Sequence, residues 1–236
     1  AGHLTVQGGT HNPMAPPADF LIRTWLPLMR RLGVQTDIQL QRHGFYPAGG
    51  GKICATTTPD SRLQPFDLQE RGTLTGLRVE AKVAGLPIMV AQRELDYIQT
   101  HLTPGLRCQL QVCPPHELPS QQGPGNVVAV EVVHEHSRET FTAFGQRGVA
   151  AESVAAQVVK QVRHYLDSCA AVSEHLADQW VMPLALAGGG SFTTTEPSSH
   201  LQTNLAILER FLPITSQIIP TTKTRYQVIL SRTPPC

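Results

Sequence analysis

The sequence predicts a mixed α/β protein, because stretches with the two-residue period of strands alternate with stretches of helical period along the chain. The strand and helix order at the start of the chain also returns at its end, with a separate strand-rich segment between them. The 236 residues are 41% hydrophobic, which is enough for the core of one large domain or two modest ones.

The first segment is expected to form one α/β unit. Strand patterns cover residues 3–7, 34–42 and 52–58. Asp19 is placed to cap a helix that runs to about Leu32, and Pro27 inside it predicts a local distortion. Residues 59–72 lack a regular period, so we expect a boundary there.

The middle segment has its own strand and helix order and is therefore interpreted as a small inserted domain. Strand patterns cover residues 73–83, part of 103–113, 127–136 and the ETFTAFG segment that follows. Helical periods cover residues 88–101 and 149–167. Residues 114–126 are rich in proline and glycine, which predicts a loop.

The last segment repeats the α/β pattern. Helices are expected over residues 173–186 and 201–212, and strands over 191–196 and 225–230. A glycine run at 188–190 separates the first of these helices from the strand that follows it.

Charge and cysteine content limit the classes of protein to be considered. The formal net charge is +1, so no global attraction to nucleic acid or membrane is expected, and no apolar run reaches membrane-spanning length. Five scattered cysteines argue against a disulfide framework and favour a reducing compartment. Cys108, Cys113 and His116 are close in sequence, but two intervening prolines and the lack of a second pair argue against zinc.

The segment HGFYPAGGGKI at residues 43–53 is the most unusual of the chain. Three consecutive glycines allow backbone angles and close approaches that other residues forbid, at a cost in chain entropy. The pattern predicts either a site of close backbone or ligand approach, or a wide loop that leads into the strand at Ile53.

His200 is the main candidate for chemistry. It lies in TEPSSHLQTN, where a strand gives way to a helix, and the positive end of a helix dipole favours a neutral, nucleophilic imidazole. The backbone amides at such a terminus also suit a phosphate. The alternative is a histidine that only hydrogen-bonds to its neighbours at the start of the helix.

Two other groups of polar residues remain open to either interpretation. His134 and His136 share one face of a strand, a spacing that suits a metal or an exposed strand end. Glu174, His175 and Asp178 share one face of a helix and could bind a base, a ribose or a metal, or simply face solvent. The chain lacks the phosphate-binding loop, dinucleotide-binding and serine-hydrolase motifs.

Together these segments resemble the RNA 3'-terminal phosphate cyclase family, near its bacterial branch. The glycine motif at 43–53 carries the resemblance most clearly. Supporting stretches are GGTHNPMAPPADF at 8–20, QGPGN at 122–126, AAESVAAQVVKQV at 150–162, LADQ at 176–179 and SSHLQTN at 198–204. The resemblance runs through nearly the whole chain.

The resemblance implies a fold of repeated units, each a four-stranded sheet with two helices, plus a smaller inserted α/β domain. Residues 1–70 would be a repeat of the large domain and residues 71–168 the insert. Residues 169–236 would be the C-terminal part of the large domain, which carries the nucleophilic histidine. A homodimer is left open, and a cytoplasmic location is expected.

The resemblance also implies an ATP-dependent enzyme that uses Mg²⁺ or Mn²⁺ to convert RNA 3'-phosphate ends into 2',3'-cyclic phosphates. The histidine that matches His200 would attack the α-phosphorus of ATP and become adenylylated. AMP would then pass to the RNA 3'-phosphate, and the neighbouring 2'-hydroxyl would close the ring and release AMP. A 3'-phosphate has no leaving group of its own, and adenylylation supplies one.

By similarity, Pro16 would lie against the adenine, and Asp178 and Gln179 would face the adenosine from the other side. His175 stands where relatives carry a tyrosine that stacks on the base, and His11 stands where close relatives have an acidic residue. No metal ligand is assigned.

The family's first repeat, with its acidic glycine-rich segment and several arginines, has no counterpart in this sequence. We therefore expect an N-terminally truncated form, or a protein whose missing part is supplied separately. Two other functions remain open: a catalytically silent relative that acts as a binding or scaffold factor in ribosome assembly, and an enolpyruvyl transferase. The presence of His200 favours the enzyme over the scaffold, and no cluster of arginine and lysine supports the transferase.

Overall fold

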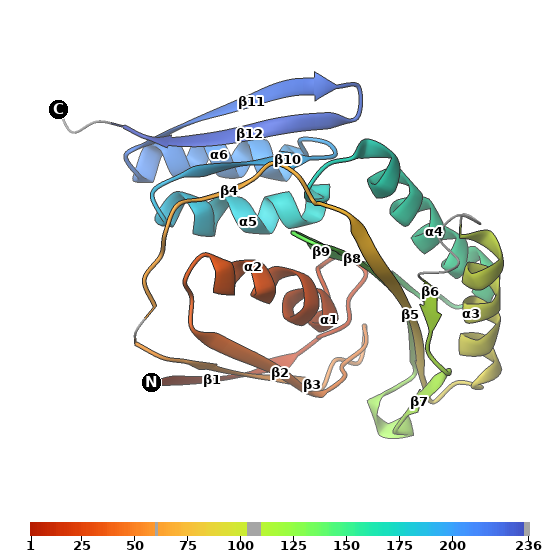
Figure 1. Cartoon of the computed structure of the whole chain (residues 1–236). Coiled ribbons are helices and arrows are strands. Elements are labelled where there is room, and N and C mark those ends of the chain that lie inside the picture. The colour runs from red at the N-terminus through yellow and green to blue at the C-terminus, as the bar shows by residue number, and fades with distance from the viewer. Residues whose placement is uncertain (60, 103–109, 234–236) are drawn as a thin grey trace.

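A computed structural model describes residues 1–59, 61–102 and 110–233. These residues form three β-sheets with helices packed against them, so the predicted mixed α/β class is confirmed (Figure 1). Within the described residues no helix is both long and apolar enough to cross a membrane. The described cysteines, Cys54, Cys113 and Cys169, are free.

The first sheet has three antiparallel strands in the order β1-β3-β2. They are β1 (Gly2–Gly8), β2 (Thr36–Arg42) and β3 (Gly51–Thr57). A helical run joins the first two strands, formed by α1 (Ala18–Phe20), the π-helical η1 (Leu21–Trp25) and α2 (Leu26–Arg31). The distortion expected at Pro27 takes the form of this π segment, since the proline ring excludes the carbonyl four residues before it.

The glycine motif forms a compact turn between β2 and β3. Gly49 and Gly50 have φ angles of 68° and 74°, which favour glycine. Gly44 leaves no room for a side chain, because a Cβ there would lie 2.2 Å from the backbone nitrogen of Gly51. Its carbonyl accepts hydrogen bonds from the backbone of Thr10 and His11, so the turn packs against the loop after β1.

The second sheet has the order β6-β5-β8-β9, with β7 beside β5. The strands are β5 (Leu74–Ala84), β6 (Leu110–Val112), β7 (His116–Leu118), β8 (Gly125–His134) and β9 (Arg138–Phe144). Helices α3 (Met89–His101) and α4 (Ala151–Ser168) pack on one face over a core of valine, leucine and alanine (Figure 1). The expected loop 114–126 contains β7 and the 3-10 helix η3 (Ser120–Gln122), and residues 103–109 of the strand expected in 103–113 lie outside the described residues.

The opposite face of the second sheet is charged. Alternate residues of β5 and β8 place Arg78, Glu80, Lys82 and Glu131 there. Arg23 of η1 lies against this face, 2.8 Å from a Glu80 carboxylate oxygen and 3.9 Å from one of Glu131. These ion pairs join the helical run of the first segment to the second sheet.

The third sheet has the order β11-β12-β10-β4. Its strands are β4 (Phe66–Leu68), β10 (Gly190–Thr194), β11 (Ile214–Thr222) and β12 (Arg225–Arg232), and its helices are α5 (Glu174–Leu186) and α6 (Ser199–Phe211). The strand β4 falls in the stretch 59–72, where we expected only a boundary. It pairs in parallel with β10, so Asp67 lies beside Ser191, 124 positions away along the chain.

The sequence pattern missed β4 and β11 for physical reasons. Three residues are too short to show a strand period, and the alternation of β11 is broken by Ile218, Ile219 and Pro220. Proline is tolerated in β11 because this strand lies at the edge of its sheet, where a ladder hydrogen bond can be missing.

One core joins the first segment to the third sheet. Phe20 and Leu28 of the helical run, and Leu32 directly after it, pack with Trp180 of α5 and Leu201 of α6, all of them buried. The helical run therefore lies between the first sheet and α5 (Figure 1). The indole N–H of Trp25 also donates to the Gln179 carbonyl at 3.3 Å, which fixes the helical run against α5.

Candidate functional site

A cavity of about 590 Å³ lies where the loop after β1, strand β9 and the first turns of α5 and α6 meet. The loop supplies Pro13, Met14, Ala15, Pro16 and Pro17; the helices supply Ser173, His175, Asp178, Gln179, His200 and Asn204. All five site residues expected from the sequence, Pro16, His175, Asp178, Gln179 and His200, line this one cavity, although they come from three separate segments of the chain.

Two helix N-termini face the cavity, and each begins with a serine cap. The hydroxyl of Ser173 accepts from the backbone N–H of Leu176 at 3.4 Å, and that of Ser198 accepts from Leu201 at 3.0 Å. His175 and His200 each occupy the second position of their helix. The cavity therefore lies at the positive ends of two helix dipoles, which favour an anion.

Asp178 connects the two helices. One of its carboxylate oxygens accepts a 2.5 Å hydrogen bond from the Ser198 hydroxyl, and its backbone carbonyl accepts from the Asn204 amide at 3.3 Å. The same serine hydroxyl caps α6, so Ser198 donates to Asp178 while it accepts from Leu201. The carboxylate of α5 thus fixes the position of the helix terminus that carries His200.

The two histidines of the cavity are accessible. His200 is exposed, and its ring makes no hydrogen bond to any other described side chain or backbone group. The side chain of His175 is 65% exposed and lies 3.7 Å from the Glu174 carboxylate. Pro16 is also exposed, on the loop that forms another part of the cavity wall. An imidazole without an internal partner is free to react with or stack on a bound ligand.

The third wall of the cavity belongs to the second sheet and was missed from the sequence. It is formed by Thr140, Phe141, Thr142, Ala143 and Phe144 of β9, with Gln146, Gln157 and Gln161. The spacing of Gln157 and Gln161, four apart on α4 and off its apolar face, was the one signal that could have found part of it. No sequence pattern within one segment could show that β9 lies beside α5.

A buried carboxyl group lies beneath this wall. Glu139 of β9 is fully buried and accepts from both the backbone N–H of Ser173, at 2.5 Å, and its hydroxyl, at 3.1 Å. Burial raises the pKa of Glu139 to about 8, and the hydrogen bonds from Ser173 act in the opposite direction. The contact attaches the second sheet to the N-terminus of the helix that carries His175 and Asp178.

The charge of the cavity wall is low. No lysine or arginine stands among its described lining residues, and Asp178 is their only carboxylate. The wall therefore suits the neutral parts of a ligand, such as a base and a sugar. A ligand phosphate would be met by the two helix termini.

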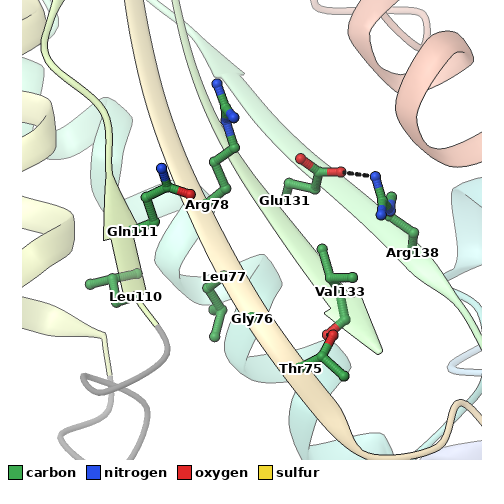
Figure 2. A pocket seen from close by; sticks show the side chains of 9 residues that line it. All are labelled: Thr75, Gly76, Leu77, Arg78, Leu110, Gln111, Glu131, Val133 and Arg138. Atoms are coloured by element: carbon green, nitrogen blue, oxygen red, sulfur yellow. Dashed lines mark hydrogen bonds and ion pairs between the residues drawn. The ribbon is translucent and has the colours of Figure 1, made fainter. Parts of the chain in front are cut away.

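A second, more open cavity of about 500 Å³ lies on the charged face of the second sheet (Figure 2). Its two arginines are already paired: Arg138 lies 3.0 Å from Glu131, and Arg78 lies 2.6 Å from Glu80. It contains none of the five expected residues, and its neutralised charges favour the first cavity as the functional site.

Comparison with known proteins places the chain in a family. The family model described as RNA 3'-terminal phosphate cyclase matches residues 1–218. An RNA 3'-terminal phosphate cyclase of Pseudomonas fluorescens is 48% identical over 225 residues, which cover 95% of this chain and 64% of the relative. One of Ralstonia nicotianae is 50% identical over 212 residues, which cover 89% of this chain and 59% of the relative. The chain thus spans less than two thirds of each relative, and it belongs to the RNA 3'-terminal phosphate cyclase family.

Proposed function

We propose that this chain carries the nucleotidyl-transfer site of an ATP-dependent RNA 3'-phosphate cyclase, with His200 as the nucleophile. The proposal rests on one observation: a single cavity is lined by His200 together with Pro16, His175, Asp178 and Gln179. The names of the relatives, whose sequences match nearly all of this chain, support the same reaction class.

The cavity fits the adenosine part of ATP. Its volume of about 590 Å³ lies in the usual range for small-molecule sites. Pro16 and His175 line the cavity from two different segments of the chain, and we propose that a planar base packs against them. Asp178 and Gln179 supply polar groups for the base edge and the ribose.

His200 would begin the reaction as the nucleophile. A ring nitrogen attacks the α-phosphorus of ATP, an N–P bond forms, the bond from the α-phosphorus to the bridging oxygen breaks, and pyrophosphate leaves with that electron pair. The N-terminus of α6 favours the incoming phosphate. Ser198, held by Asp178, fixes the direction from which His200 approaches.

The second half of the reaction would use the same site. An oxygen of the RNA 3'-phosphate attacks the phosphorus of the adenylylated histidine and releases the imidazole. The neighbouring 2'-hydroxyl then attacks the activated 3'-phosphate, loses its proton, and displaces AMP to leave the 2',3'-cyclic phosphate. Gln146, Gln157 and Gln161 form the wall that is free to contact the RNA nucleotide.

A divalent ion, Mg²⁺ or Mn²⁺, is proposed to accompany the nucleotide. Asp178 is the one carboxylate on the cavity wall, which is too few for a resident ion but sufficient for one that is held mainly by phosphates and water. When bound, the ion would neutralise phosphate charge and polarise the phosphorus that His200 attacks. We also propose a cytoplasmic location, which the free cysteines support.

The test is covalent labelling. The chain is incubated with α-³²P-ATP and Mg²⁺ or Mn²⁺, and His200→Ala is compared with His116→Ala, an exposed histidine far from the cavity in the second sheet. We expect an acid-labile label on the chain and on His116→Ala, and none on His200→Ala. A label that persists in His200→Ala would remove His200 as the nucleophile. If neither the wild-type chain nor either variant takes the label, the proposed activity of this chain is wrong.

A further inference from the structure

Three side chains that could bind a metal gather behind the loop wall of the cavity. His11 follows β1, Asp19 belongs to α1, and His43 begins the glycine motif. Their ligand atoms all lie within 4.8 Å of one another, and among the residues that the structure describes this is the one such group of three. His11 and Asp19 are buried, and His43 is half-buried.

Hydrogen bonds orient two of these side chains toward one point. The Asp19 carboxylate has its Oδ1 occupied by Lys82, at 3.0 Å, while its Oδ2 lies 2.9 Å from the Nε2 of His11. The other ring nitrogen of His11, Nδ1, lies 3.0 Å from the Thr10 hydroxyl. A ligand histidine whose far nitrogen is hydrogen-bonded in this way is the usual arrangement at protein metal sites.

The ring of His43 gives a second, separate indication of a metal site. Its Nε2 is buried and has no hydrogen-bond partner, which is rare for a ring nitrogen and calls for an explanation. Its ring centroid lies 4.8 Å from that of His11, so the free nitrogen lies beside the pair formed by His11 and Asp19. A bound cation would satisfy this nitrogen and replace the hydrogen bond between His11 and Asp19.

The donor set selects the class of ion. Two imidazole nitrogens and one carboxylate oxygen suit Zn²⁺ and similar divalent transition metals better than Mg²⁺ or Ca²⁺. The ligand atoms of a tetrahedral Zn²⁺ are about 3.3 Å apart. The ligand atoms of His11, Asp19 and His43 lie within 4.8 Å of one another, so the widest distance between two of them must shorten by roughly 1.5 Å when the ion binds. A rotation of the His43 side chain would supply this movement. A water molecule would take the fourth position.

The surrounding charges leave one oxygen of Asp19 directed at the histidines. Lys82 lies 3.0 Å and Arg23 3.4 Å from Asp19 Oδ1, so these two cations would compete with the ion for the carboxylate. Glu80 and Glu131 add no net negative charge, because arginines pair with both. Asp19 Oδ2 faces His11 and is the oxygen that would bind the ion.

We propose that His11, Asp19 and His43 bind one divalent transition-metal ion, such as Zn²⁺. Two of the ligands stand at the ends of the segment 12–18, whose residues 13–17 line the large cavity. The ion fastens both ends of this loop to the glycine motif, and so fixes the cavity wall that carries Pro16. The motif at 43–53 then has a chemical role besides forming a turn.

The experiment uses the intact chain after removal of metal with EDTA. Co²⁺ is titrated in, because four-coordinate Co²⁺ gives intense visible absorption bands, and the thermal midpoint is measured with and without Zn²⁺. His43→Gln and His11→Gln are compared with His116→Gln, whose imidazole is exposed. Far-ultraviolet circular dichroism verifies that each variant is folded. If one of the two ligand variants fails to fold, the other is compared with the wild type and with His116→Gln.

We expect one equivalent of Co²⁺ with four-coordinate bands in the wild type and in His116→Gln. In the ligand variants we expect affinity to fall by more than about 100-fold, beyond the loss seen when only an outer hydrogen-bond partner is removed. Zn²⁺ should raise the thermal midpoint of the wild type but not of His43→Gln. Equal bands in wild type and His43→Gln, or no bands in the wild type, would overturn the proposal.

Discussion

The Ser198 hydroxyl donates a 2.5 Å hydrogen bond to Asp178 and accepts another from the backbone N–H of Leu201. One side chain thus caps α6 and fastens it to α5, directly beside His200. The relationship makes the position of His200 depend on a carboxylate more than twenty residues away in the sequence, and it can be tested by removing one hydroxyl.

Ser198→Ala should therefore affect both stability and chemistry. Loss of the cap is expected to lower the free energy of unfolding by about 0.5–2 kcal/mol, measured by urea denaturation. The proposed labelling of His200 by ATP should slow as well, because Asp178 no longer fixes the start of α6. The matched control is Ser199→Ala, one residue along, whose hydroxyl makes no described hydrogen bond. Equal losses in both variants would contradict the role given to Ser198.

Glu139 should contribute a loss of stability as the pH rises. Its pKa is raised by burial from an ordinary value of 4.5 to about 8, so the folded state holds a proton that the unfolded state has released. Between these two values the folded state binds more protons, and its stability therefore falls with increasing pH. Glu94, whose pKa burial raises to about 7, acts in the same direction over a narrower range.

The measurement compares the free energy of unfolding of the wild type and Glu139→Gln at about pH 5 and about pH 9. We expect the variant to lose clearly less stability over this interval than the wild type. Glu94 acts in both proteins, and so do His43 and His134, whose pKa values burial lowers to about 4 and which add stability as the pH rises toward about 7. Glu117→Gln, an exposed position on β7, should follow the wild type. If the wild type and Glu139→Gln show the same pH dependence, the pKa of Glu139 is not raised in the folded protein.

Gly44→Ala should strongly destabilise the first sheet. The new Cβ would lie 2.2 Å from the backbone nitrogen of Gly51 and 2.6 Å from the carbonyl oxygen of Gly8, and backbone atoms cannot move aside cheaply. A loss of more than about 3 kcal/mol is expected, measured as the shift in the denaturation midpoint. Gly9→Ala is the control, because a Cβ there meets nothing within 4 Å. A small effect at Gly44 would show that the turn can open.

Arg71 should be a stabilising residue at the end of α4. Its guanidinium donates to the carbonyls of Tyr165, at 2.8 Å, and Leu166, at 2.7 Å, and lies over the Tyr165 ring. Arg71→Met is expected to cost about 2–3 kcal/mol, since charged donors to helix-end carbonyls are lost. Arg147→Met, at an exposed position without described contacts, should change stability by less than about 0.5 kcal/mol. Similar values for the two variants would refute the prediction.

Sequence reasoning worked where one segment carries its own signal. The alternation in residues 127–136 and the helical period of 149–167 predicted β8 and α4, because each pattern follows from the burial of one face. The expected site residues came from the resemblance of short motifs to a family, and the cavity contains all of them.

The remaining features depend on contacts between segments far apart in the chain. The pairing of β4 with β10 requires Asp67 to lie beside Ser191, and the contact of Glu139 with Ser173 joins a sheet to a helix terminus. The contact between His11 and His43 arises because the loop after β1 packs on the turn of the glycine motif. None of these contacts leaves a period or a motif in the sequence, so no local pattern could predict them.

The parallel pairing of β4 with β10 has a consequence for the order of folding. The two strands are separated by the whole second sheet and its helices, yet Arg71 holds the far end of that segment at Tyr165 and Ala170. Once the segment between them has folded, the open loop that must close shrinks from about 120 residues to about 25, which lowers the entropic cost of closure by roughly 1.4 kcal/mol. The third sheet, and the cavity at its helix termini, should therefore assemble after the second sheet has formed.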